Sequence, residues 1–230
     1  MNLNAPGINT YNEKPLHAAL KHWYAQPGAR LEAPIDGYII DVVQDDLLIE
    51  IQTGSFASLK AKLRDLVQRH PVRLVYPIPY EKWIVKLPQE PDGKSTRRKS
   101  PKRGSVVELF AELVSFPRLL AHPNFTLEVL MTQEDEVRRF DGRKAWRRRG
   151  WVIEDRRLLD VVARHRFDTP NALAALLPAD LPAPFTTADL ATALGQSRRL
   201  AQKMAYCLRE TGIIEAAGKR GRAVLYMASL

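Results

Sequence analysis

Two short apolar runs near the N-terminus constrain the fold of this chain more than any other feature. They are GYIIDVV (37–43) and LLIEIQT (47–53), and only Gln44, Asp45 and Asp46 separate them. Both runs are β-branched and apolar, and two such runs split by a short polar turn predict a β-hairpin. The chain is therefore expected to build its N-terminal part around an antiparallel pair of strands.

The segments on either side of this hairpin predict an α/β domain. Leu16 and Leu20 lie at helical spacing before the hairpin, and Ser55 can cap a helix with an apolar stripe after it. A strand, a helix and a strand with short connections imply a right-handed crossover and a mixed sheet. The expected elements are helices over 13–24, 56–69 and 105–114, and strands over 72–78, 82–87 and 126–132.

Three polar side chains interrupt the apolar hairpin. Asp41 lies near the end of its first strand, and Glu50 and Gln52 share one face of the second because side chains alternate along a strand. An acid and an amide in so apolar a run are costly to bury unless something satisfies them. The two carboxylates can converge on one hard cation, such as Mg²⁺, which would polarise a phosphoryl oxygen and activate a bound water. Gln52 can orient that water or bind a phosphate, but it cannot act as a base.

At these residues, over about 12–87, the chain resembles the PD-(D/E)XK nuclease superfamily, which has the restriction-endonuclease-like fold. The superfamily pattern is an Asp on one hairpin strand and Glu-x-Lys on the next, followed by a helix that crosses to a further strand. Asp41, Glu50 and Gln52 match this pattern with glutamine in place of lysine, a variant found in a minority of active restriction enzymes. Glu13 matches the Glu that the superfamily often adds on its first helix. The resemblance implies catalytic roles for these four residues, with Asp41 and Glu50 as ligands of Mg²⁺ or Mn²⁺.

Two alternatives stay open at this point. The spacing Asp-x(8)-Glu-x-Gln also arises by chance, and a strand with one solvated face would then belong to an unrelated fold. A nuclease fold can also survive without activity, as a DNA-binding regulator or scaffold. Asp36 is predicted as a turn residue but can compete for the metal, and His17 and His22 are predicted as ordinary helix residues. The chain also resembles an uncharacterised bacterial family that shares the LLIEIQT segment.

The region 155–230 is predicted as a second, mainly helical domain. Leu158, Leu159 and Val162 are expected in the core of its first helix. After a capped helix through ADLATAL, a basic helix over about 197–211 and a hairpin with a basic turn follow. This order resembles a winged helix-turn-helix, in which the recognition helix enters the major groove and the wing contacts phosphates or the minor groove. The nucleic-acid-binding residues expected here are Arg198, Arg199, Lys203, Lys219, Arg220 and Arg222.

Two basic segments divide the rest of the chain. Residues 91–104 carry six basic and no apolar residues, which predicts a mobile loop within a restriction-endonuclease-like domain over 1–140. Residues 141–154 are predicted as a basic connector. Its arginines Arg147, Arg148 and Arg149 are expected to bind nucleic acid, and its tryptophans either join them or pack at the domain junction.

The composition agrees with a nucleic-acid partner. The 230 residues include 35 Lys and Arg against 26 Asp and Glu, a net charge of +9. Such a surplus favours a polyanion, and DNA is predicted as the partner, with RNA as the alternative. No apolar stretch approaches a membrane-spanning length and the first residues do not resemble a signal peptide, so a cytoplasmic protein without membrane contact is expected. The single Cys207 excludes an internal disulfide and a cysteine-rich zinc site. A homodimer would supply the two active sites that double-strand cleavage usually requires.

Overall fold

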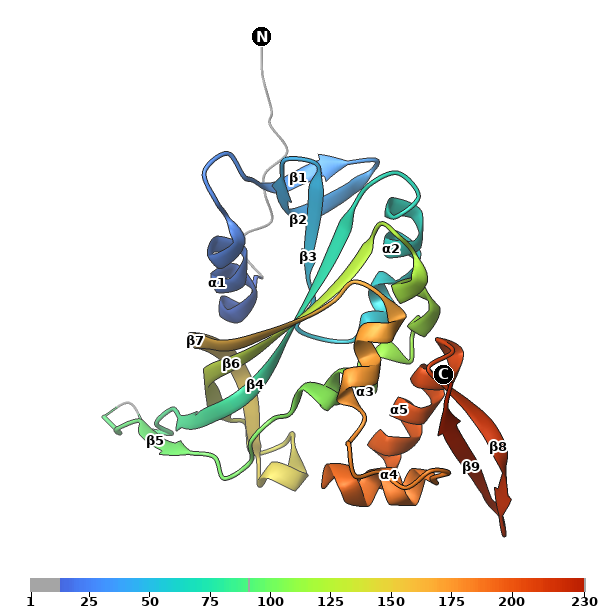
Figure 1. Cartoon of the computed structure of the whole chain (residues 1–230). Coiled ribbons are helices and arrows are strands. Elements are labelled where there is room, and N and C mark those ends of the chain that lie inside the picture. Colours follow the sequence, from blue (N-terminus) through green and yellow to red (C-terminus); the bar gives the residue numbers. More distant parts are fainter. Residues whose placement is uncertain (1–12, 91, 230) are drawn as a thin grey trace.

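One mixed sheet of seven strands runs through the molecule, whose computed structural model describes residues 13–90 and 92–229 (Figure 1). The strand order is β1-β2-β3-β4-β6-β7, and β5 pairs with β4. β4 lies parallel to β3 and β6, and the other neighbours are antiparallel. The strands are β1 (Arg30–Ile35), β2 (Tyr38–Gln44), β3 (Leu47–Ile51), β4 (Val72–Lys86), β5 (Thr96–Lys99), β6 (Phe125–Phe140) and β7 (Trp151–Phe167). The predicted α/β class with a mixed sheet is therefore confirmed.

Helices cover both faces of this sheet (Figure 1). The first helix packs over a small core that includes Leu16, Leu20 and Ile49, and the others surround a larger core that extends from Leu63 to Met204. No helix in the described part of the chain is both long and apolar enough to cross a membrane. The α-helices are α1 (Pro15–Tyr24), α2 (Lys60–Leu66), α3 (Phe110–Leu113), α4 (Thr187–Leu194) and α5 (Arg198–Glu210). The 3₁₀ helices are η2 (Phe56–Leu59), η3 (Val106–Leu109), η4 (Pro117–Ala121), η5 (Trp146–Arg148) and η6 (Pro170–Leu176).

Two strands of the N-terminal part differ from the sequence prediction. β1 is absent from the prediction because it is an edge strand in which only Ala33 is buried, so its apolar pattern is weak. The two strands predicted over 72–78 and 82–87 form the single strand β4, which continues through an irregularity between Pro79 and Glu81. Proline is tolerated at such bulges because its missing N–H leaves no gap in the ladder there.

The predicted connector and the first helix predicted after it form part of a long hairpin. β6 and β7 pair from Leu127↔Phe167 to Phe140↔Trp151, so the sheet reaches well beyond the borders predicted at 140 and 155. The helix expected around Leu158, Leu159 and Val162 is therefore wrong, and those residues lie in β7. Leu159 and Val162 are extra residues at bulges, where two residues of β7 face one of β6. Side chains of a strand alternate between the two faces of the sheet, and each bulge shifts this alternation by one residue. The apolar residues of β7 therefore fall at helical spacing in the sequence.

The basic segment 91–104 is also more ordered than predicted. Its residues Thr96–Lys99 form β5, which pairs with Trp83–Lys86 of β4. Arg97 lies 2.9 Å from Asp135, and Lys99 lies 2.8 Å from Glu81. The prediction of a mobile loop is wrong for this part because acidic side chains of β4 and β6 neutralise the segment.

The C-terminal elements lie where the sequence predicts them. Thr186 and Asp189 form a capping box at the start of α4, and Gly195 ends that helix in the left-handed conformation at φ 60°. After α5, a hairpin of β8 (Ile214–Arg220) and β9 (Ala223–Ala228) completes the chain. Leu208 of α5 belongs to the same core as Leu113 of α3, so the C-terminal elements share one core with the helices that cover the sheet.

Candidate active site where strands β2 and β3 separate

The candidate site lies where β2 and β3 stop pairing. The two strands pair over residues 42–44 and 47–49. Asp41 and Glu50 are the next residues along each strand, so their backbones lie at the open end of the ladder. Two acidic side chains are thus brought together by the hairpin that the sequence predicts.

Glu50 is buried against α2 with a lysine as its partner. Its neighbours Ile49 and Ile51 face the core under α1, so Glu50 points to the other face of the sheet, as the predicted alternation requires. The Nζ atom of Lys62 lies 2.6 Å from Oε1 of Glu50 and donates a hydrogen bond to the carbonyl of Ile39 at 2.6 Å. Burial, and then the charge of Asp41, raises the pKa of Glu50 to about 7, although Lys62 opposes the rise.

Asp41 is held by the backbone and by a histidine. Its Oδ2 atom accepts a hydrogen bond from the N–H of Ile51 at 2.8 Å and lies 3.2 Å from Nε2 of His17. The other ring nitrogen of His17 lies 2.7 Å from Glu13. Burial alone would lower the pKa of His17, but Asp41 and Glu13 raise it to about 9. His17 is therefore a charged residue of the site, and its prediction as an ordinary helix residue is wrong.

Glu13 reaches the carboxylates only through His17. It lies two residues before α1 and also pairs at 2.5 Å with Lys21, a buried residue that contacts Glu32. Burial by itself would raise the pKa of Glu13, but the hydrogen bonds from Lys21 and His17 lower it by more. The pKa of Glu13 is therefore below its usual value. This chain of charges fastens α1 to the ends of β2 and β3.

Gln52 does not contact either carboxylate. Its Oε1 atom accepts a hydrogen bond from the N–H of Gly54 at 3.0 Å, and its Nε2 atom donates to Ser58 at 3.2 Å. The side chain thus orders the loop that leads from β3 to η2. Asp36, the predicted competitor for the metal, pairs instead with Arg69 and His70, both at 2.9 Å.

The site offers two carboxylates for a cation and no complete protein cage. Across residues 13–90 and 92–229, no group of three or more His, Cys, Asp or Glu side chains is arranged to hold a metal ion. Mg²⁺ is usually held by one or two carboxylates and completes its shell with water and substrate phosphate. Lys62 already brings a positive charge to the Glu50 carboxylate. Asp41 and Glu50 are two carboxylates of the kind that Mg²⁺ uses, and a cation at Glu50 would have to share or displace the contact with Lys62.

The residues predicted to bind nucleic acid fall into two groups. Lys203 donates to the carbonyl of Ala111 at 2.6 Å, and Arg220 pairs with Asp189 at 2.7 Å, so both are engaged within the protein. The remaining ones are exposed and form no ion pair with a described residue. They are Arg147, Arg148, Arg149, Arg198, Arg199, Lys219 and Arg222.

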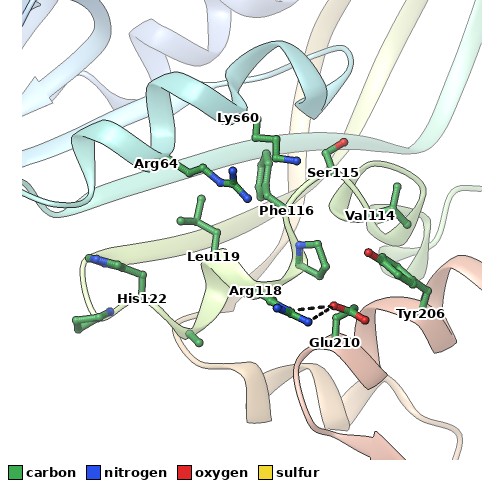
Figure 2. A pocket seen from close by; sticks show the side chains of 13 residues that line it. Lys60, Arg64, Val114, Ser115, Phe116, Arg118, Leu119, His122, Tyr206 and Glu210 are labelled. Carbon is green, nitrogen blue, oxygen red and sulfur yellow. Dashed lines mark hydrogen bonds and ion pairs between the residues drawn. The ribbon is translucent and has the colours of Figure 1, made fainter.

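A cavity of about 710 Å³ lies apart from the carboxylates, between α2, η4 and α5 (Figure 2). Lys60 and Arg64 of α2 line it, and Arg118 crosses it to Glu210 at 2.8 Å. It contains none of the acidic residues of the candidate site. α2 therefore carries exposed cations on one side and the site residue Lys62 on another.

Lys62 and His17 are the two residues of the site that the sequence reasoning missed. Lys62 occupies an inward position in the apolar stripe that contains Leu59, Leu63 and Leu66. A lysine in such a stripe needs a buried partner, and that signal points to an acid on the adjacent strand. No comparable pattern singles out His17.

Comparisons with known proteins place the chain in a family. The sequence model described as "Domain of unknown function (DUF8091)" matches residues 14–168, from the start of α1 to the end of β7. The chain belongs to this family. A DUF8091 chain thus carries the sheet and the candidate site within the family's own segment, and the last elements lie beyond it. A protein of Treponema pallidum (strain Nichols), described as "Uncharacterized protein", is 35% identical over 221 residues, which cover 95% of this chain and 86% of that protein. No solved structure matches.

Proposed function

We propose that this DUF8091 chain is a metal-dependent nuclease of the PD-(D/E)XK type that hydrolyses phosphodiester bonds in DNA. The observation that carries the proposal is the placement of Asp41 and Glu50 at the open end of a strand pair, where Lys62 lies 2.6 Å from Glu50 and the charge of Asp41 helps to raise the pKa of Glu50. The order α1, β1, β2, β3, α2, β4, with β3 parallel to β4, agrees with the core that the resemblance implies.

The three residues divide the chemistry between them. Asp41 and Glu50 would hold Mg²⁺ or Mn²⁺, which supplies Lewis acidity for phosphoryl transfer and lowers the pKa of a bound water. Lys62 would place its charge beside a phosphate oxygen of the substrate, where charge accumulates during the displacement. In the resemblance, Gln52 stands in place of the lysine of Glu-x-Lys. Lys62 of α2 supplies the missing charge because Gln52 is neutral and engaged in the loop.

His17 serves as a positioning residue. In the metal-free chain Asp41 and Glu13 raise its pKa to about 9, so at neutral pH the imidazolium pairs with the Asp41 carboxylate. The contacts of His17 fix the Asp41 carboxylate between the imidazolium and the N–H of Ile51. Glu13 in turn fixes the ring of His17 from the other side.

We further propose that α4, α5 and the β8–β9 hairpin bind DNA as a winged helix-turn-helix. Recognition helices contact base edges mainly through their N-terminal residues. Arg198 and Arg199 occupy the first positions of α5 and are exposed. Lys219 lies near the end of β8 and Arg222 in the turn that follows, and both are exposed as well. Lys203 takes no part in this interface because it is bound to Ala111.

The test of the nuclease is cleavage of plasmid and of labelled single strands in Mn²⁺, in Mg²⁺ and in chelator. We expect cleavage by the wild type only with metal, and its loss in Glu50→Gln and in Asp41→Asn. The matched control is Asp180→Asn, which removes an exposed acid of the loop between η6 and α4 that forms no ion pair with a described residue. Cleavage that persists in Glu50→Gln would contradict the assignment of the site.

The alternative is a nuclease fold that serves only as a DNA-binding regulator or scaffold. Binding of DNA by the wild type, with no cleavage of any substrate in either metal, would favour it. Competition between DNA and RNA ligands of equal length separates DNA-directed from RNA-directed binding.

A further inference from the structure

The tip of the β6–β7 hairpin, residues 141–150, carries a concentrated and uncompensated positive charge. Its five cations are Arg143, Lys144, Arg147, Arg148 and Arg149. All five are exposed, and none forms an ion pair with a described residue. The acids at the base of the tip, Asp141 and Glu154, lie 3.9 and 3.5 Å from Arg139 instead. The tip therefore differs from β5, whose cations are matched by acids of the sheet.

Two tryptophans near this tip have opposite environments. Trp151 packs against the ring of Phe140 at 5.5 Å between centroids, and Lys86 lies over its ring at 4.2 Å. Trp146, by contrast, is 81% exposed, and the guanidinium of Arg147 lies 5.3 Å from the centre of its ring. Trp151 thus holds the hairpin together, and Trp146 presents its indole to solvent. The exposed indole stands among five exposed cations, and this combination, rather than one exposed ring by itself, indicates a partner.

The backbone of the tip is built to project this indole. Trp146 starts the short helix η5, which is flanked by Ala145 and Arg149 in the left-handed conformation at φ 58° and 52°. Ala145 accepts hydrogen bonds from the N–H groups of Arg148 at 2.8 Å and Gly150 at 3.2 Å. A side chain at Gly150 would meet Phe140 at 2.7 Å, so the hairpin closes tightly behind the turn. Left-handed backbone at non-glycine residues is retained where the surrounding structure requires it.

We propose that this tip binds nucleic acid and that Trp146 stacks on an unpaired base while the surrounding arginines contact phosphates. The inference rests on the proposed function and narrows its substrate to DNA with a single-stranded or frayed segment. Aromatic rings that stack on bases, combined with cations that follow the backbone, are the usual means of binding single strands. A membrane surface fits less well because Trp146 is the one large apolar side chain of η5 and cations lie on both sides of it.

The tip lies far from the candidate active site along the sheet. Glu50 is level with Leu74 of β4 and, across it, with Leu127 of β6, whereas the tip begins after Phe140. That stretch of strand spans about 40 Å at the usual rise of a β-strand. A substrate must therefore be long to engage both, about 12 base pairs if it is B-form between them.

The experiment is binding of the full chain to a 30-nucleotide single strand and to a blunt duplex of the same sequence, both in chelator. We expect Trp146→Ala to weaken single-strand binding at least fivefold, Trp146→Phe to recover most of the loss, and duplex binding to change less than twofold. Quenching of tryptophan fluorescence by the single strand should be largest in the wild type. The matched control is Trp23→Leu, which removes a half-exposed indole from α1.

Equal binding of the single strand by Trp146→Ala and wild type would overturn the inference. So would binding to anionic phospholipid vesicles that Trp146→Ala abolishes while single-strand binding is unchanged. Because these measurements need no metal, they are independent of the nuclease proposal. If cleavage depends on Glu50 but single-strand binding does not depend on Trp146, only this inference is contradicted. If single-strand binding depends on Trp146 but the chain cleaves no substrate, only the nuclease proposal is contradicted.

Discussion

Replacing Glu50 with glutamine should stabilise the metal-free protein at neutral and alkaline pH. Glu50 is 3% exposed, and burial with the charge of Asp41 raises its pKa to about 7. In the unfolded chain a glutamate titrates near 4.5. The folded state therefore binds a proton that the unfolded state has released, and this contribution to stability is complete below pH 4.5 and lost as the pH rises through 7.

The size of the effect follows from that difference in pKa. One pKa unit corresponds to about 1.4 kcal/mol, so wild type should lose about 3 kcal/mol relative to Glu50→Gln between pH 4.5 and pH 8. Lys62 keeps its hydrogen bond to the carbonyl of Ile39 in the variant, and its side chain is 17% exposed, so its loss of a partner offsets only part of the gain.

Urea unfolding of both proteins in chelator at several pH values measures this difference directly. The exposed-acid variant Asp180→Asn is the control, and its stability should follow that of wild type throughout. A difference between Glu50→Gln and wild type that is independent of pH, or that grows as the pH falls, would refute the reasoning.

Two further substitutions test the ion pairs of the sheet and the site. Arg156→Met removes the partner that Glu134, a buried residue, contacts at 2.7 and 2.8 Å, and urea unfolding at pH 7 should show a loss of about 3 kcal/mol. Adding Glu134→Gln to this variant should recover most of the lost free energy of unfolding. A double variant as unstable as Arg156→Met would argue against a buried ion pair. Lys62→Met should reduce metal-dependent DNA cleavage at least tenfold, whereas Lys60→Met, which removes an exposed cation of the same helix, should leave the rate nearly unchanged. Equal cleavage rates in Lys62→Met and Lys60→Met would contradict the assignment of Lys62 to the site.

The candidate site was accessible to sequence reasoning because its residues break a strong local pattern. Asp41 and Glu50 stand out in apolar strands, and the short polar turn between the strands fixes how they meet. The residues that pair with these two acids belong to α1 and α2, and the hairpin sequence gives no indication of which residues they are. Lys62 is the exception, because its place in an apolar stripe already demands a buried acid.

The second half of the sheet could not be predicted because its pattern is irregular. The bulges of β7 place Leu158, Leu159 and Val162 at helical spacing in a strand. The basic segment forms the strand β5 because acids such as Glu81 neutralise it, and these acids are remote from it in the sequence. A charge run without visible partners is therefore a poor guide to mobility when a sheet edge with acidic residues is available.

Binding of Mn²⁺ to the metal-free chain, measured by calorimetry at pH 7.5, tests the central claim most directly because it needs no knowledge of the substrate. We expect that wild type binds Mn²⁺, that Asp41→Asn and Glu50→Gln each weaken the binding at least tenfold, and that Gln52→Ala leaves it nearly unchanged. A wild-type chain that does not bind Mn²⁺, or variants of Asp41 and Glu50 that bind it as tightly as wild type, would contradict a metal site between β2 and β3.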